Sequence, residues 1–160
     1  HIKKKIKSKN IICVAPDVGG TERARALGKI LNLGLAIVDK RRPKPGQSQV
    51  MNIVGDVKGK TCVIVDDIID SGGTIVNAAK ALKDRGAKEV YVYITHGVLS
   101  GDAVKKIKNS VIKNLVITDT IDNVTKTKNV KNIEVLSISS LMGEAIKRIS
   151  NSTSVSDLFK

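Results

Sequence analysis

Short runs rich in valine and isoleucine recur along the chain. They lie at 11–15 (IICVA), 61–65 (TCVIV), 89–94 (EVYVYI) and 114–118 (NLVIT). Continuous apolar runs of this length, with no strict alternation, are typical of parallel strands that are covered on both faces. Segments with helical spacing separate the runs. This order predicts an α/β domain with a mainly parallel sheet, flanked by helices and joined by right-handed crossovers.

The predicted helices are marked by apolar residues three and four positions apart. In 73–86 the stripe ends before Gly86, and glycine often follows the last turn of a helix. Similar stripes precede Gly34 and follow the capping candidates Ser139 and Ser140. The three stripes consist of Ile75, Ala78, Ala79 and Leu82; of Ala24, Leu27 and Leu31; and of Leu141, Ala145 and Ile149. In sheets of this kind, ligands bind at the carboxyl ends of the strands.

Three segments interrupt the alternation of strands and helices. Residues 40–48 (KRRPKPGQS) combine two prolines, a glycine and four cations, which predicts an exposed, mobile loop and excludes the interior of a strand or helix. Residues 119–132 are predicted to form a second long connection, and 151–160 a polar tail. The sequence contains no internal repeat.

The length of 160 residues, 41% of them hydrophobic, predicts a single domain over 1–160. Cys13 and Cys62 lie inside apolar runs and not at a metal-binding spacing, so we interpret them as small buried hydrophobes in a reducing compartment. No stretch approaches the ~18 apolar residues of a membrane span, and the first ten residues lack the apolar core of a signal peptide. We therefore expect a soluble, cytoplasmic protein without a membrane partner.

A formal charge of +13 raises the hypothesis of a nucleic-acid partner. Binding to single strands also needs aromatic side chains between the cations. Tyr91, Tyr93 and Phe159 are the only tyrosine, phenylalanine or tryptophan residues, and none is interleaved in this way. We favour a solvated basic surface that also suits small anionic substrates, and we expect no nucleic acid as partner. An RNA-binding protein remains an alternative, for which we would expect salt-sensitive binding to nucleic acid.

The stretch VIVDDIIDSGGT (63–74) places acids and glycines directly after an apolar run. Val65 is predicted to end the buried strand, and Gly72, Gly73 and Thr74 to start the next helix. Backbone N–H groups at a helix start are unpaired and carry the positive end of the helix dipole. Small residues let a phosphate approach these groups, and Ser71 and Thr74 add hydroxyl donors. The turn therefore predicts a phosphate site.

The acids Asp66, Asp67 and Asp70 must serve another part of the ligand, because carboxylates repel phosphate. Carboxylate oxygens accept hydrogen bonds from vicinal hydroxyls, or hold a divalent cation. Phosphate at one end and acids at the other indicate a phosphorylated ribose. The alternative is a capped turn with Asp70 or Ser71 at the N-cap and solvated acids. Capping leaves Asp66 and Asp67 without an explanation.

Residues 62–74 resemble the phosphoribosyl diphosphate motif of the type I phosphoribosyltransferase fold. Further stretches are similar to the ribose-phosphate pyrophosphokinases, also called phosphoribosyl diphosphate synthetases, so that the resemblance covers almost the whole chain. These stretches are APDVGGTERARALG (15–28), DKRRPKPGQSQVMNIVGDVKGK (39–60), THGVLSGDA (95–103), TDTI (118–121) and SVSDLF (154–159). The resemblance implies transfer of the β,γ-diphosphoryl group of ATP, with Mg²⁺, to the 1-hydroxyl of ribose 5-phosphate, a step of nucleotide biosynthesis.

The resemblance also implies roles for individual residues. The catalytic lysine and arginine of the family's mobile loop fall on Lys40 and Arg42, whereas Arg41 and Lys44 are interpreted as solvated. An aspartate before two glycines is more often a turn residue, but in the family this position, Asp17, binds Mg²⁺, and one carboxylate suffices for that ion. His96 is interpreted as a polar residue at a strand end.

The tail residues Ser154 and Ser156 fall where the family binds a regulatory phosphate, through which inorganic phosphate activates and ADP inhibits. The family's subunit has two related domains and forms homo-oligomers, and the chain resembles the second domain. We therefore expect the chain to be the C-terminal half of such a subunit, with little or no activity alone. The alternatives are a base phosphoribosyltransferase, for which we find no base-binding hood, and a non-catalytic synthetase-associated homologue, for which we would expect eroded acids or a rewritten loop.

Overall fold

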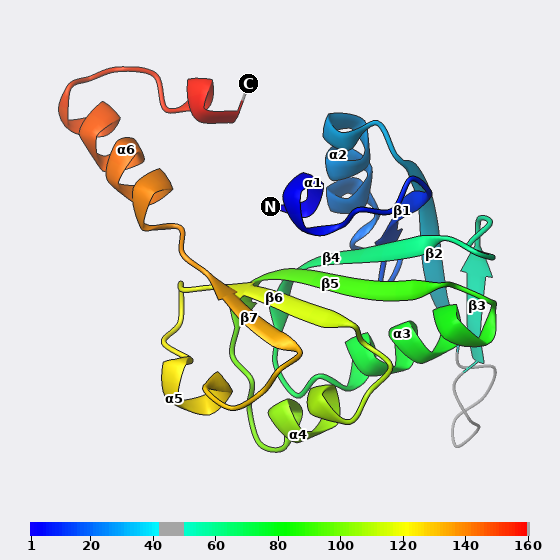
Figure 1. The fold of residues 1–160 in the computed structure, drawn as a ribbon. Coiled ribbons are helices and arrows are strands. Elements are labelled where there is room, and N and C mark those ends of the chain that lie inside the picture. The colour runs from blue at the N-terminus through cyan, green and yellow to red at the C-terminus, as the bar shows by residue number, and fades with distance from the viewer. Residues whose placement is uncertain (42–49, 160) are drawn as a thin grey trace.

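The computed structural model describes residues 1–41 and 50–159, which form a seven-stranded sheet with helices on both faces (Figure 1). The strand order is β3-β2-β1-β4-β5-β6-β7, and every neighbouring pair is parallel except β2 and β3. The strands are β1 Ile11–Ala15, β2 Gly34–Arg41, β3 Val50–Val54, β4 Thr61–Ile69, β5 Glu89–Gly97, β6 Asn114–Thr118 and β7 Ile133–Leu136. The predicted α/β class with a mainly parallel sheet is confirmed.

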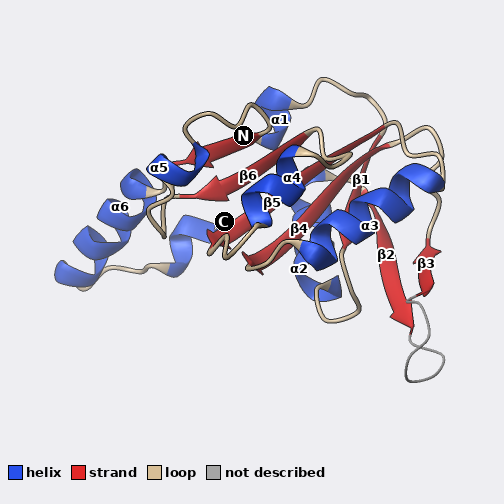
Figure 2. Cartoon of the chain, turned by 90° about the horizontal axis from the view of Figure 1, so that it is seen from below, coloured by secondary structure: helices blue, strands red, loops and turns tan. Residues whose placement is uncertain are grey.

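The helices form two layers around this sheet. Figures 1 and 2 show α3, α4 and α5 on one face and α1 and α2 on the other, whereas α6 continues away from the end of β7. The bounds are α1 Ile2–Lys5, α2 Thr21–Leu31, α3 Gly73–Asp84, α4 Ala103–Lys108, α5 Val124–Thr127 and α6 Ser139–Ser150, followed by the short 3₁₀ helix η1, Ser156–Phe159. In the part of the chain that the structure describes, no helix is long and apolar enough to cross a membrane.

The core lies mainly between the central strands and α3. Val14 and Ile64 are fully buried in β1 and β4, and the predicted stripe of α3, including Leu82, packs against the sheet. Full burial of such a side chain contributes about 1.5–3 kcal/mol. Both cysteines are fully buried and free, as predicted. Burial raises the pKa of the thiols, of Cys13 to about 11 and of Cys62 to about 12.

Three predicted boundaries at the ends of strands were wrong. β5, predicted to end at Ile94, continues to Gly97. β4 continues beyond Val65 through both acids to Ile69, because its ladder with β5 continues through Asp66 opposite Ile94. The predicted loop at 40–48 begins too early, since Lys40 and Arg41 are the last residues of β2 and pair with β3.

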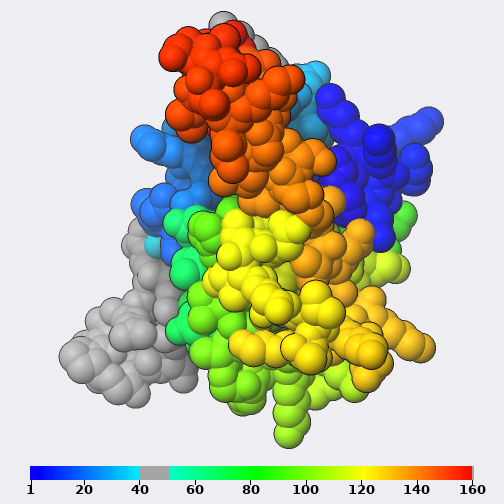
Figure 3. Space-filling view, turned by 90° about the vertical axis from the view of Figure 1, so that its left-hand side faces the viewer, coloured from blue at the N-terminus to red at the C-terminus, as the bar shows by residue number. Residues whose placement is uncertain are grey.

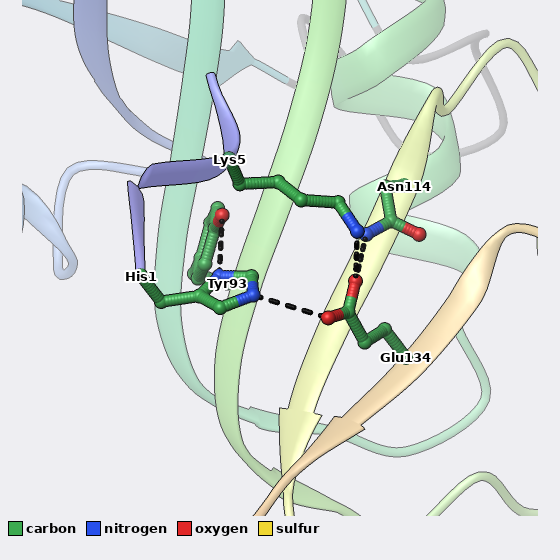
Figure 4. Close-up of polar contacts among 5 residues, drawn as sticks. All are labelled: His1, Lys5, Tyr93, Asn114 and Glu134. Atoms are coloured by element: carbon green, nitrogen blue, oxygen red, sulfur yellow. Dashed lines mark hydrogen bonds and ion pairs between the residues drawn. The ribbon is translucent and has the colours of Figure 1, made fainter. Parts of the chain in front are cut away.

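Helix α6 forms where it was predicted but packs differently from the other long helices. Leu141 is 45% exposed and Ile149 is 67% exposed, and none of the helix's residues, all of which are described, is buried. The capping candidates Ser139 and Ser140 lie inside the helix, which Ile138 precedes as N-cap. In Figure 3 the orange and red surface of α6 and the tail stands out from the body of the molecule. The apolar stripe of α6 therefore contributes little to the core of this chain.

Candidate functional site

The strand order creates a point at which the chain leaves two neighbouring strands in opposite directions. From β1 it runs through α2 to β2 on one side, and from β4 through α3 to β5 on the other side and the other face (Figure 1). The crevice at the carboxyl ends of two such strands is the usual ligand site of open α/β sheets. Asp17 follows β1 here, and the acids Asp66 and Asp67 occupy the end of β4.

The first turn of α3 is open. Its N-cap is Gly72, with φ of +76°, a conformation that favours glycine, and among the described residues no side chain caps the helix. The first intrahelical bond runs from Val76 N–H to Gly72 O at 3.0 Å, which leaves the N–H groups of Gly73, Thr74 and Ile75 without partners inside the helix. A Cβ placed on Gly73 would meet no described atom within 4 Å. The alternative of a turn capped by Asp70 or Ser71 is therefore not what the structure shows.

A pocket of about 230 Å³ lies at this helix start. Its lining comes from the β1–α2 connection, the end of β4 and the first turn of α3. The lining residues are Asp17, Asp66, Ile68, Ile69, Asp70, Ser71, Gly72, Gly73, Thr74 and Ile75. The pocket thus brings together the predicted phosphate-binding turn, two of the three predicted acids and the predicted metal ligand. Asp67 does not line it.

Both acids at the end of β4 contact one arginine that the sequence reasoning missed. Arg23 Nη1 lies 2.6 Å from Asp66 Oδ1, and Arg23 Nη2 lies 2.9 Å from Asp67 Oδ2. Asp67 N–H also donates to Asp66 Oδ1 at 3.0 Å. The available signal was the position of Arg23 in the first turn of the helix that follows Gly19 and Gly20, because that turn begins at the carboxyl edge of the sheet.

The two carboxyls titrate differently. Burial of the Asp66 carboxyl, together with the neighbouring Asp67 carboxylate, raises the pKa of Asp66 in spite of the Arg23 contact. Asp67 is exposed, and its slight desolvation is outweighed by the charge of Arg23 and by hydrogen bonds, so the pKa of Asp67 is lowered. Asp67 is therefore the more readily ionised member of the pair.

Asp17 serves the turn before α2 and also faces the pocket. Its Oδ1 accepts a hydrogen bond from Gly20 N–H at 2.9 Å, so the turn role that composition favours is realised. The same side chain lines the pocket with Asp66 and Asp70. The described residues contain no group of three or more His, Cys, Asp or Glu side chains that could hold a metal ion.

The ends of β5 and β6 are tied to each other by side chains. His96 lies exposed at the end of β5 with Nδ1 3.0 Å from Thr120 Oγ1, and Thr118 Oγ1 donates to Thr95 O at 2.7 Å. Asp119 Oδ1 accepts from Ile138 N–H at 2.9 Å. These contacts connect the carboxyl ends of β5, β6 and β7, next to the acid pair on β4.

A model of the phosphoribosyl synthetase-associated domain matches residues 39–160. The chain belongs to this family. A ribose-phosphate pyrophosphokinase of Rhizobium meliloti (strain 1021) is 55% identical over 158 residues, which cover 99% of this chain and 51% of that protein. The chain thus spans about half the length of the curated relatives it matches.

Solved structures give the same picture of the phosphoribosyl synthetase family. The phosphoribosylpyrophosphate synthetase of Mycobacterium smegmatis superimposes with a TM-score of 0.84 at 34% identity, covering 94% of this chain and 48% of that one. An adenine phosphoribosyltransferase of Saccharomyces cerevisiae, 18% identical, shares the fold, with a TM-score of 0.55 over 70% of this chain and 71% of that one. The expected type I phosphoribosyltransferase-like fold is confirmed.

The remaining predicted residues lie elsewhere in this phosphoribosyl synthetase-associated fold. The backbone of Lys40 pairs with Met51 in the β2–β3 ladder, but its side chain and all of Arg42 lie outside the described residues. Ser154 and Ser156 belong to the tail after α6, and their hydroxyl oxygens are 2.8 Å apart. Arg148 holds this part of the tail by donating from Nη1 to Ser154 O at 2.8 Å.

Proposed function

We propose that the chain is part of a ribose-phosphate pyrophosphokinase and provides its ribose 5-phosphate site. The proposed reaction transfers the β,γ-diphosphoryl group of ATP to the 1-hydroxyl of ribose 5-phosphate and yields phosphoribosyl diphosphate and AMP. The observation that carries the proposal is the open start of α3, which lies in one pocket with Asp66 and Asp70 at the switch point of the sheet. The names of the relatives and their identity along almost the whole chain support it.

The substrate is oriented by its two ends. The unpaired N–H groups of Gly73 and Thr74 and the hydroxyls of Ser71 and Thr74 bind the 5-phosphate, because they combine hydrogen-bond donors with the positive end of the helix dipole. Gly72 supplies the left-handed turn that brings the backbone close. The carboxylates of Asp66, Asp67 and Asp70 accept hydrogen bonds from the ring hydroxyls. The 1-hydroxyl is thereby fixed in one direction for the transfer.

Transfer of the diphosphoryl group requires positive charge near its oxygens. In this proposal Lys40 and Arg42 stabilise the charge on its oxygens and exclude water from the transferable group. Both residues belong to the segment of the family match that begins at residue 39.

Magnesium fits the residues at this site. Asp17 places a hard carboxylate oxygen in the same pocket as the sugar-binding acids, and Mg²⁺ keeps several waters and takes only one or two protein carboxylates. Asp17 would hold the ion, which when bound neutralises charge on the phosphates of ATP.

We further propose that the chain is the C-terminal half of a two-domain subunit. In this proposal the full-length protein is a homo-oligomer, Ser154 and Ser156 bind a regulatory phosphate in competition with ADP, and the chain alone has little or no turnover. The coverage of 51% and 48% of the two relatives supports the division into halves. Release of AMP from ATP and ribose 5-phosphate by the isolated chain, at a rate that is typical of enzymes, would contradict the last point.

Isothermal titration calorimetry of ribose 5-phosphate tests the site. We expect weak binding that falls at least about tenfold in Thr74→Ala and in Asp66→Ala, because each loses a hydrogen bond to a charged group. Thr125→Ala is the matched control, an exposed threonine in α5. Ribose without the phosphate should bind more weakly still. Absence of binding to the unaltered chain, or an equal affinity for ribose, would overturn the proposed site.

A further inference from the structure

Arg23 occupies a position between two acids that the proposed function assigns to the sugar. One nitrogen of its guanidinium faces Asp66 and the other faces Asp67, at 2.6 Å and 2.9 Å. The planar fork of arginine suits this arrangement, in which two N–H groups point to two acceptors at once. The arginine side chain is 40% exposed, so the contact lies at the rim of the crevice and not in the core.

The contact requires two neighbouring strand residues to turn their carboxylates to the same side. Successive side chains of a β-strand point to opposite faces, and Asp66 and Asp67 are neighbours in β4. A single guanidinium reaches both only when the two carboxylates are turned toward the same side. The hydrogen bond from Asp67 N–H to Asp66 Oδ1 belongs to the same arrangement. Arg23 therefore orients the pair.

The positive charge of Arg23 also compensates the negative charge of the acids at the site. Asp66 lines the 230 Å³ pocket with Asp17 and Asp70, and it lines a second, more apolar cavity of about 280 Å³ with Tyr93 of β5 and Arg23 of α2. Among the described residues that line either cavity, Arg23 is the one cation. Two neighbouring carboxylates without an opposite charge retain one proton more readily, and a protonated carboxyl has less capacity to accept hydrogen bonds.

We propose that Arg23 is a positioning residue for the acid pair: its guanidinium turns Asp66 and Asp67 to one side of β4 and keeps both carboxylates as anions, able to accept hydrogen bonds from two vicinal hydroxyls. Arg23 acts through the acids and needs no contact with the substrate. The vicinal diol as ligand rests on the proposed function, whereas the effect on the acids does not.

Carboxyl ¹³C NMR titration of the ligand-free chain tests the effect on the acids. In Arg23→Gln we expect at least one of the two carboxyl pKa values to rise by about one unit, because an opposite charge within hydrogen-bonding distance lowers a carboxyl pKa by about 1–3 units. Arg25→Gln removes the same charge from an exposed position of the same helix and should leave both values unchanged. Equal titration of Arg23→Gln and the unaltered chain would overturn the inference.

If Arg23→Gln does not fold, Arg23→Lys gives the same test. Lysine keeps the charge but contacts one carboxylate at a time, so one carboxyl should titrate at higher pH than in the unaltered chain. Unchanged titration of both carboxyls in a folded Arg23→Lys chain would also overturn the inference.

The pH dependence of ribose 5-phosphate binding tests the consequence for the ligand. As the pH is lowered from 8 towards 4.5, we expect Arg23→Gln to lose affinity at a higher pH than the unaltered chain or Arg25→Gln, because a raised carboxyl pKa means protonation at a higher pH. The second ionisation of the sugar phosphate, with a pKa near 6, affects all variants equally and cancels in the comparison.

The two proposals can fail separately. Suppose that the carboxyl titration changes in Arg23→Gln, but neither the unaltered chain nor any variant binds ribose 5-phosphate. The role of Arg23 then stands and the proposed function fails. If the unaltered chain binds and Arg23→Gln shows the same titration and the same pH profile, the role of Arg23 is refuted and the proposed function stands.

Discussion

The start of α3 and the segment from α6 to the tail both carry proposed phosphate sites, yet they are built in different ways. The first follows β4, whose Val63 and Ile64 are fully buried, and its donors are backbone groups of a helix that packs on the sheet. The second follows a helix without a buried residue, and its donors are the hydroxyls of Ser154 and Ser156.

The difference teaches how each site is held in place. Backbone donors at the start of α3 are fixed by the same contacts that stabilise the fold, so a ligand there meets a formed site. The hydroxyl pair of the tail is held by a few polar contacts around Arg148, which include Glu144 at 2.9 Å and Ser154 O at 2.8 Å. We expect the first region to respond to changes in the core and the second to changes in surface contacts.

The largest expected effect compares one isoleucine from each region. Ile64→Ala should lower the free energy of unfolding by about 3 kcal/mol, because it leaves a cavity at a fully buried position. Ile146→Ala, at a position 63% exposed in α6, should change it by less than about 0.5 kcal/mol. Urea denaturation followed by circular dichroism measures both. A cost for Ile146→Ala close to that of Ile64→Ala would show that α6 is packed in this chain.

The next effect compares one glycine from each region. The expected changes in stability have opposite signs. Gly72→Val should lower the stability by about 2 kcal/mol and abolish ribose 5-phosphate binding, because a β-branched residue is strained at φ of +76°. Gly143→Ala should raise the stability by about 0.5–1 kcal/mol, since a methyl group there meets nothing within 4 Å and alanine favours a helix. Thermal unfolding and calorimetry measure the two. A stable, binding-competent Gly72→Val chain would contradict the role of this turn.

The smallest global effect concerns the attachment of the tail. Arg148→Gln should lower the free energy of unfolding by less than about 1 kcal/mol, as is usual for partly exposed ion pairs. The local effect should be larger: hydrogen exchange of the amides in 153–158 should become several-fold faster, because the contact with Ser154 O is lost. Lys147→Gln, at an exposed neighbouring position, is the control. Exchange that is unchanged in Arg148→Gln would mean that Arg148 does not hold the tail.

The sequence predicted the centre of the fold better than its edges. The runs at 11–15 and 114–118 have the bounds of β1 and β6, because strands covered on both faces are continuously apolar. β2, which lies beside the edge, and the edge strands β3 and β7 were not predicted; the short edge strands, such as IEVL at 133–136, lack such a run. The end of β4 was placed too early because its acids are polar, whereas pairing with β5 depends on the backbone.

The candidate site was predictable as far as it is local in sequence. Residues 66–74 form one strand end and one helix start, and their spacing alone indicated both the phosphate and the sugar end. Arg23 lies 43 residues before Asp66, and its contact depends on the placement of β1 beside β4, which no local pattern encodes. The exposure of α6 was not predictable either, because an apolar stripe does not show what covers it.

The burial of both thiols has a practical consequence for studying the tail. Cys13 and Cys62 have raised thiol pKa values of about 11 and 12 and no access to solvent, so they remain protonated and out of reach of alkylating reagents in the folded chain. A single cysteine introduced at an exposed position of α6 can therefore be labelled with a fluorophore or spin label in an otherwise unaltered chain. The two native cysteines therefore need not be replaced before such a label is attached.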